Sequence, residues 1–195
     1  MYQFIETIQI LDGEILLLEY HNRRMNETIR HFFGNNKPID LKQHINSHNL
    51  TGEIKCRIVY DNNIVDVSYT PYTMRSIQSL KLVQNDEIDY SYKSADRSPL
   101  SLLAAQKGEA DEILIVRQGL LTDTSFSNIA LFDGNEWSTP GHPLLKGTQR
   151  AYLIDQGLLH EKDIRAEDLY HYQKLSLINA MIDLGKIEIP IVYIK

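Results

Sequence analysis

The chain has 195 residues, of which 43% are hydrophobic and 24% charged, a composition typical of a globular protein with one large or two small domains. Its formal net charge of -6, with no basic run longer than Arg23-Arg24, argues against a nucleic-acid partner, and no apolar run approaches the about 18 residues of a membrane span. The single cysteine, Cys56, excludes an internal disulfide, and the first residues lack a signal-peptide pattern, so we expect a cytoplasmic protein with no membrane partner.

The first part of the chain predicts a hairpin and then a helix. Residues 4–10 begin with apolar and polar alternation, and Asp12-Gly13 is a typical hairpin turn before the apolar residues 15–18. Apolar side chains recur at helical spacing over residues 19–33, and Gly34 follows as a C-cap. His21 and Arg24 are three residues apart and therefore neighbours on this helix, although a solvated helix face would give the same spacing.

A second helix and two strands are predicted next. Residues 39–48 favour the helix, and residues 54–60 and 64–69 favour strands joined by a short turn rich in Asp and Asn. The character of the sequence changes after Ser79. We therefore predict an N-terminal α/β domain over residues 1–79 and a C-terminal domain over residues 80–195.

The second half predicts further strands and helices in alternation. Strands are expected over residues 80–83, 88–93, 112–116, 136–139 and 187–194, where Pro190 suggests an edge position. Helices are expected over residues 99–107, 148–156 and 166–173.

Residues 120–132 predict a strand of unusual polarity. It lies between two turn signals, yet it is almost wholly polar from Thr122 to Asn128. In a regular strand Asp123, Ser125 and Ser127 would share one face, and an enclosed carboxylate there would need a cationic or hydrogen-bonding partner. A solvated edge strand is the other interpretation of the same residues.

Four features together match the needs of pyridoxal phosphate. Lys93 supplies an amine for a Schiff base, Asp123 supplies an acid that can keep the pyridine nitrogen protonated, and Arg24 is a helical cation. Gly147-Thr148 opens a helix, whose backbone N–H groups and positive dipole end favour a phosphate. The seven histidines are scattered without metal-ligand spacing, so we expect no metal site.

The chain resembles the class IV aminotransferases over nearly its whole length. Residues 4–7 are similar to the family's Phe-Glu-Thr opening, and residues 18–25 are similar to its helix motif with a phosphate-binding arginine. Tyr92-Lys93 resembles the position of the Schiff-base lysine. Residues 121–129 are similar to the Thr-Glu-Gly-Ser-x-Ser-Asn-Ile signature, with Asp123 in place of the usual Glu, and residues 145–150 resemble the Gly-Ile-Thr-Arg phosphate loop.

The resemblance implies a fold, a partner and a set of site residues. The fold is the two-domain α+β fold-type IV, with a small N-terminal α/β sandwich and a C-terminal β-barrel-like domain with helices, and the family is usually homodimeric. Lys93 is implied as the catalytic residue. The implied cofactor contacts are Arg24, Lys93, Asp123, Ser127, Asn128, Gly147, Thr148, Asn179 and Ala180. Tyr92 and Arg97, and beside them Tyr90 and Lys146, are candidates for substrate binding.

The resemblance favours one reaction. Residues 177–181 are similar to a late Asn-Ala-Leu segment of 4-amino-4-deoxychorismate lyases, which release pyruvate and leave 4-aminobenzoate for folate biosynthesis. We therefore expect a short lyase of this kind. An aminotransferase acting on branched-chain or D-amino acids and a non-catalytic member of the family are the alternatives.

Overall fold

A computed structural model describes residues 2–195, which divide into two compact units. Unit 1 comprises the described residues 2–74 and Tyr92–Asp96, and unit 2 comprises Arg75–Ser91 and Arg97–Lys195. The segment that carries Lys93 therefore belongs to unit 1, although the residues on either side of it belong to unit 2. The predicted domains, residues 1–79 and 80–195, stay a prediction.

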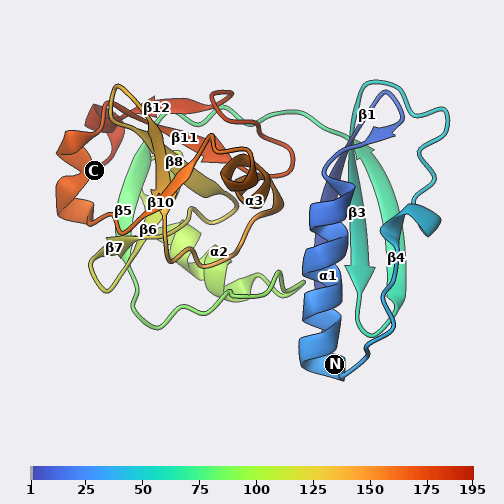
Figure 1. The fold of residues 1–195 in the computed structure, drawn as a ribbon. Coiled ribbons are helices and arrows are strands. Elements are labelled where there is room, and N and C mark those ends of the chain that lie inside the picture. The colour runs from blue at the N-terminus through green and yellow to red at the C-terminus, as the bar shows by residue number, and fades with distance from the viewer. Residues whose placement is uncertain (1) are drawn as a thin grey trace. The chain divides into compact units, whose positions relative to one another are not determined.

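Unit 1 consists of one helix, α1 (Leu18–Phe33), packed on a four-stranded antiparallel sheet (Figure 1). Its strands, in the order β2-β1-β3-β4, are β1 (Phe4–Leu11), β2 (Glu14–Ile15), β3 (Glu53–Tyr60) and β4 (Ile64–Pro71). The hairpin between β1 and β2 turns at Asp12 and Gly13, which both have positive φ, as a two-residue hairpin turn of this twist requires.

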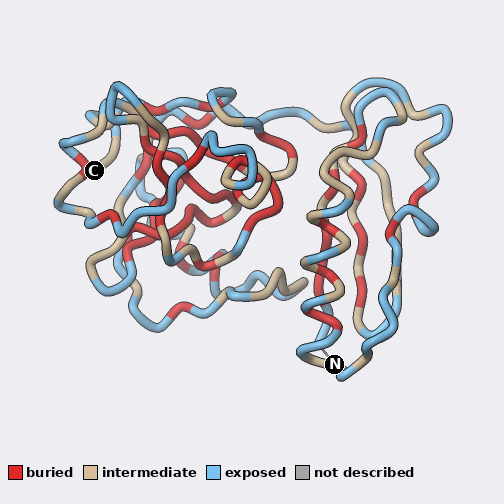
Figure 2. Tube along the Cα trace, viewed as in Figure 1, coloured by how far each residue is buried: buried red, intermediate tan, exposed pale blue. Residues whose placement is uncertain are grey.

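The core of unit 1 lies between α1 and the sheet. Alternate residues of β1, namely Phe4, Ile8 and Ile10, pack with Met25 and Ile29 of the helix. Buried positions accordingly recur along α1, β1 and β3 (Figure 2). The α/β sandwich predicted for the start of the chain is present.

The segment Tyr92–Asp96 lies along the first half of β1. The Ile5 N–H donates to the Lys93 carbonyl oxygen (2.9 Å), and the Ala95 N–H donates to the Gln3 carbonyl oxygen (2.9 Å). Beside it, the Tyr92 ring stacks on His31, with ring centroids 4.8 Å apart. The strand predicted over residues 88–93 does not form, and backbone bonds to β1 hold Lys93 instead.

Unit 2 is built on two separate sheets. The first has the order β5-β6-β7, with β5 and β6 parallel, and the second has the order β10-β9-β8-β11-β12. The strands are β5 (Leu80–Gln84), β6 (Glu112–Arg117), β7 (Leu120–Leu121), β8 (Asn128–Phe132), β9 (Trp137–Pro140), β10 (His160–Lys162), β11 (Lys174–Ile178) and β12 (Glu188–Pro190). Within the described part of unit 2 the sheets do not close, so the barrel-like domain takes the form of two open sheets.

Two α-helices complete unit 2. These are α2 (Ser98–Ala104), which continues as a 3-10 helix over Ala105–Lys107, and α3 (Thr148–Asp155). A further 3-10 helix, Ile191–Tyr193, follows β12, which lies at the sheet edge as Pro190 predicts. Among the described residues no helix combines the length and the apolar character needed to span a membrane.

Two predicted helices take the form of 3-10 helices. Residues 39–48 contain only a 3-10 helix, Leu41–Gln43, which the Asp40 side chain caps by accepting from the Lys42 N–H. Residues 166–173 form a 3-10 helix, Ala166–His171.

The polar strand predicted over residues 120–132 is also wrong in its middle. β7 ends at Leu121 and β8 begins at Asn128, and the residues between them are irregular. The cause is Thr124, whose Oγ1 accepts from the N–H groups of Phe126 (3.3 Å) and Ser127 (3.0 Å) and turns the chain. Asp123, Ser125 and Ser127 therefore do not share a strand face.

Candidate active site

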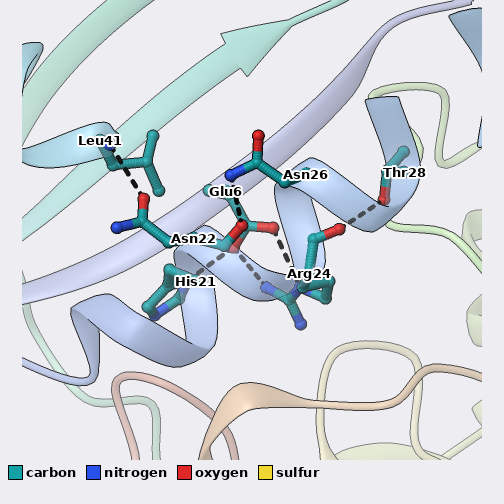
Figure 3. Close-up of polar contacts among 7 residues, drawn as sticks. All are labelled: Glu6, His21, Asn22, Arg24, Asn26, Thr28 and Leu41. Carbon is teal, nitrogen blue, oxygen red and sulfur yellow. Dashed lines mark hydrogen bonds and ion pairs between the residues drawn. The ribbon is translucent and has the colours of Figure 1, made fainter. Parts of the chain in front are cut away.

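In unit 1, Arg24 is held by the carboxylate of Glu6, a residue of the Phe-Glu-Thr-like opening that had no predicted role. Arg24 Nε donates to Glu6 Oε1 (2.9 Å) and Arg24 Nη2 donates to Glu6 Oε2 (2.5 Å). His21 Nδ1 lies 2.6 Å from the same Oε2. Figure 3 shows the Glu6 carboxylate between the two α1 side chains. His21 and Arg24 face the sheet together, so this part of the helix is not a solvated face.

The local sequence explains this arrangement. Glu6 lies on β1 in the row of core residues between Phe4 and Ile8, so its side chain points towards α1. On α1, His21 and Arg24 are three residues apart and reach the same point. Thr28 Oγ1 donates to the Arg24 carbonyl oxygen (2.9 Å) one turn later.

The charges of this cluster are strongly coupled. Burial acts to raise the pKa of Glu6, but the Arg24 charge and the His21 hydrogen bond outweigh it and lower that pKa to about 2. Burial lowers the pKa of His21 more than the Glu6 carboxylate raises it, and the charges of Arg24 and Lys93 lower it further. The cluster is therefore a carboxylate, a guanidinium and a neutral imidazole, and it lies within electrostatic range of Lys93.

In unit 2, Asp123 is a buried carboxylate without a bonded cation. Its Oδ1 accepts from Asn128 Nδ2 (2.8 Å) and its Oδ2 accepts from the Leu145 N–H (2.8 Å). Burial raises the pKa of Asp123 to about 6, against the opposing effect of these donors and of the Arg150 charge. A carboxylate in this state favours a cationic ligand, because its own donors are neutral.

Asn128 connects Asp123 to the loop before α3. Its Nδ2 also donates to the Leu145 carbonyl oxygen (2.8 Å), so Leu145 is bonded through both of its backbone groups. A Cβ on Gly147 would lie 2.0 Å from Asn128 Oδ1. Gly147 has φ -69, so this close approach, rather than its backbone angle, is what requires glycine.

The start of α3 suits an anion. No side chain caps this helix at Gly147, and the first N–H groups of an α-helix lack partners within the helix. Thr148 is buried in the first turn. Ser127 is buried as well, and its Oγ lies 2.8 Å from Thr124 Oγ1, so this hydroxyl supports the turn between β7 and β8.

Two more predicted residues, Asn179 and Arg97, bond the irregular segment between β7 and β8, whereas Tyr92 lies in unit 1. Asn179 Nδ2 donates to the Phe126 carbonyl oxygen (3.3 Å), and Ala180 follows it in a turn closed by the Met181 N–H on Asn179 Oδ1. Arg97 Nη2 donates to the Ser125 carbonyl oxygen (2.7 Å). Tyr92 belongs to the aromatic cluster of unit 1. In unit 2 the structure thus brings Asn179 and Arg97 to the same loop as Asp123 and Asn128.

The residues present fit pyridoxal phosphate. Asp123 offers a buried acceptor for a protonated ring nitrogen, α3 offers an uncapped N-terminus for a phosphate, and unit 1 offers a fixed guanidinium and a lysine. The sequence motifs gave no role to Glu6 and Leu145. A signal for Glu6 existed, since a carboxylate interrupts the apolar row of β1, whereas the Leu145 N–H acts through its backbone and leaves no signal in its residue type.

The family model described as amino-transferase class IV matches residues 3–188. An uncharacterized protein from Haemophilus influenzae is 33% identical over 193 residues, an alignment that covers 93% of this chain and 98% of that protein. The match extends over both units.

Solved structures share the fold. A "putative 4-amino-4-deoxychorismate lyase" from Haemophilus somnus has a TM-score of 0.88 and 39% identity, covering 94% of this chain and 98% of that one. The PLP-bound form of a hypothetical aminotransferase from Mycobacterium tuberculosis has a TM-score of 0.77 and 17% identity, covering 95% and 80%. The α+β fold predicted from the sequence is confirmed.

Proposed function

The chain belongs to the class IV aminotransferase family, and on that premise we propose that it is a pyridoxal-phosphate-dependent 4-amino-4-deoxychorismate lyase. The reaction would release pyruvate from aminodeoxychorismate and leave 4-aminobenzoate, a step of folate biosynthesis. The observation that carries the choice of reaction is the 39% identity, over 94% of this chain, to the Haemophilus somnus protein named for that activity.

The geometry of each unit supports the proposed cofactor contacts. Asp123 would accept the hydrogen bond of the protonated pyridine nitrogen, and the raised pKa of this carboxyl supports the pairing, because a cation relieves the cost of its burial. Arg24 and the α3 N-terminus at Gly147-Thr148 would bind the phosphate. Bound pyridoxal phosphate supplies an electron sink for the charge that develops at the substrate α-carbon.

Lys93 would carry out the covalent and proton-transfer work. Its Nζ would hold the cofactor until the substrate amine replaces it, and the released amine would then take the α-proton of the substrate. The backbone bonds to β1 fix the position of Lys93, so its side chain starts from a defined point next to the Glu6 cluster of unit 1.

Three polar side chains would support Asp123 and the turn that follows it, namely Asn128, Ser127 and Asn179. Asn128 aligns Asp123 through Nδ2, while Asn179 holds the Phe126 carbonyl oxygen beside Ser127. Arg97 and Tyr92 stay our candidates for the substrate carboxylate. A second function, transfer of the amino group between amino and keto acids, is favoured by the description of the family model itself.

An absorbance titration tests the cofactor and separates the two reactions. We expect purified protein to develop a Schiff-base band with pyridoxal phosphate, and Lys93→Ala to lack it. With aminodeoxychorismate, formation of 4-aminobenzoate and pyruvate while the band persists supports the lyase. Conversion to the pyridoxamine form with L- or D-amino acids would instead support the aminotransferase. A chain that shows no band would contradict the cofactor assignment.

We also propose that the chain is a homodimer, as the resemblance implies. Light scattering should then give about twice the 22.5 kDa of the monomer. A monomeric mass over the concentration range used for the assays would contradict this proposal.

A further inference from the structure

The row of β1 residues that faces α1 contains one charge among apolar side chains. Phe4, Ile8 and Ile10 occupy this row with exposures of 3% or less, and Glu6, in the same row, is 0% exposed. On β3, the residue paired with Glu6 is Ile58, which is also fully buried. An apolar residue at position 6 would suit this core better than a carboxylate, because a buried ion pair is often no more stabilising than well-packed apolar groups.

The contacts of Glu6 fix the orientation of Arg24. Each carboxylate oxygen accepts from a different nitrogen of the guanidinium, at 2.9 Å and 2.5 Å, which sets the plane of the group as well as its position. The Arg24 side chain is 13% exposed, so it reaches the surface of unit 1 while its inner edge is bonded. Such a fork is lost when arginine is replaced by lysine.

His21 holds the carboxylate in turn. Its Nδ1 lies 2.6 Å from Glu6 Oε2, and because the carboxylate only accepts, Nδ1 carries the proton. Glu6 Oε2 is thereby shared between His21 and Arg24, as Figure 3 shows. The carboxylate cannot rotate away from the guanidinium without breaking the bond to His21.

We propose that Glu6 is a positioning residue for phosphate binding by Arg24, with His21 as the side chain that holds Glu6 in place. This inference rests on the proposed function, in which Arg24 binds the cofactor phosphate. A long arginine side chain loses conformational freedom when it binds a ligand, and the Glu6 contacts remove that freedom beforehand.

Glu6 affects Arg24 through its charge and through the orientation that it imposes, and the two effects predict opposite changes in phosphate binding when Glu6 is replaced. As a negative charge beside Arg24, Glu6 weakens the attraction of the guanidinium for a phosphate. If charge alone decided, Glu6→Gln would bind phosphate more tightly. If orientation decides, the same substitution weakens binding, because the amide of Gln cannot accept from both guanidinium nitrogens and from His21.

The experiment compares the affinities for pyridoxal phosphate and for pyridoxal, which lacks the phosphate. Equilibrium dialysis of each variant gives both dissociation constants, and their ratio is the phosphate preference. We expect Glu6→Gln to lower this preference about three- to tenfold, with little change in pyridoxal affinity. An unchanged or increased preference would overturn the proposal.

Two controls separate positioning from a structural role and from the proposed function. Ile58→Val removes a methyl group opposite Glu6 and should lower the melting temperature without changing the phosphate preference. Arg24→Ala should lower the preference further than Glu6→Gln does, while the α3 N-terminus keeps part of it. If Arg24→Ala keeps the full phosphate preference, the proposed role of Arg24 is overturned, and this inference with it. If Arg24→Ala loses preference but Glu6→Gln does not, this inference alone is overturned.

Because the loss of a buried charge can prevent folding, Arg24→Lys provides a second route. It keeps the positive charge but cannot bridge both oxygens of Glu6 in one plane. If Glu6 positions Arg24, Arg24→Lys should lower the phosphate preference about as far as Glu6→Gln does. A preference equal to that of the unmodified protein would overturn the proposal.

Discussion

Glu6 in unit 1 and Asp123 in unit 2 are both buried carboxyl groups, yet their pKa values move in opposite directions. That of Glu6 falls to about 2, and that of Asp123 rises to about 6. Burial raises both. The difference lies in the partners, since Glu6 is bonded to the Arg24 guanidinium, whereas the N–H groups of Leu145 and Asn128 that bond Asp123 are neutral.

The two carboxyl groups differ in whether the fold itself supplies a bonded cation. The charge of Glu6 is compensated within the fold, so this carboxylate can serve to orient another side chain. The charge of Asp123 gains a bonded cation only from a ligand, which the pyridinium of the proposed cofactor would supply. In both units, the chemistry of a buried acid depends more on the donor that meets it than on the depth of burial.

Loss of the compensated carboxylate should have the largest effect on stability. Glu6→Ala leaves Arg24 and His21 without their buried partner, and we expect the free energy of unfolding to fall by about 3–5 kcal/mol. Urea denaturation at pH 7 measures it. Glu53→Ala is the matched control in the same sheet, where one hydrogen bond to Gln9 is lost at a cost of about 1 kcal/mol. An equal fall in the free energy of unfolding in the two variants would contradict the larger contribution expected of Glu6.

Loss of the uncompensated carboxylate should act on catalysis instead. Asp123→Asn keeps the size of the side chain but removes the negative charge, and we expect kcat/KM for 4-aminobenzoate formation to fall roughly 10²–10³-fold. Stability at pH 8 should rise rather than fall, because the variant no longer buries the ionised carboxylate whose pKa is raised by burial. Asp133→Asn, at an exposed turn after β8, should keep full activity. An active Asp123→Asn enzyme would remove Asp123 from the mechanism.

The two acids should also give opposite slopes of stability against pH. The lowered pKa of Glu6 contributes stability that is present above pH 4.5 and is lost as the pH falls towards 2. The raised pKa of Asp123 has the opposite sign, so the free energy of unfolding falls as the pH rises from 3.8 to about 6. Each contribution amounts to about 3 kcal/mol.

Denaturation curves from pH 2 to 7 would resolve these contributions. Glu6→Gln should remove the rise between pH 2 and 4.5, and Asp123→Asn should remove the fall between pH 3.8 and 6. A profile that is the same in the unmodified protein and both variants would show that neither carboxyl group titrates as described.

The smallest expected effect concerns the support of Asp123. Gly147→Ala would place a Cβ 2.0 Å from Asn128 Oδ1, and we expect a stability loss of about 1–3 kcal/mol as Asn128 is displaced. Adding Asn128→Ala should cost less than the sum of the single changes, because the clash is gone. Gly141→Ala, where the new Cβ meets the exposed Asp163 side chain at 3.2 Å, is the matched control. Strict additivity would contradict the contact between Asn128 and position 147.

Sequence patterns predicted the regular elements well and the polar contacts poorly. The apolar spacing over residues 19–33, with Gly34 after it, gave α1 almost to the residue, and the β-rich runs gave β3 and β4. In place of the helix predicted over residues 39–48, Asn26 of α1 bonds both backbone groups of Ile39, including the carbonyl oxygen that the helix would have used. Such long-range bonds leave no periodic signal.

In the candidate site, too, the characteristic residues could be predicted, but their polar partners could not. Residue types pointed to Lys93, Arg24 and Asp123, because their chemistry is characteristic. The partners that set their geometry are Glu6, whose only signal is a charge in the apolar row of β1, and the backbone of Leu145, which any residue could provide. The predicted roles in cofactor binding await the titrations described above.

The buried thiol of Cys56 makes unit 1 separately observable. Cys56 lies on β3 at 0% exposure, and burial raises its pKa to about 11, so the folded chain shields its one cysteine from alkylating reagents. Labelling then proceeds only when the sheet opens, and its rate reports the opening equilibrium of this unit. The one tryptophan, Trp137, lies on β9 of unit 2 beside Phe132, and its fluorescence follows the other unit. A single unmodified chain can thus report the opening of each half of the molecule separately.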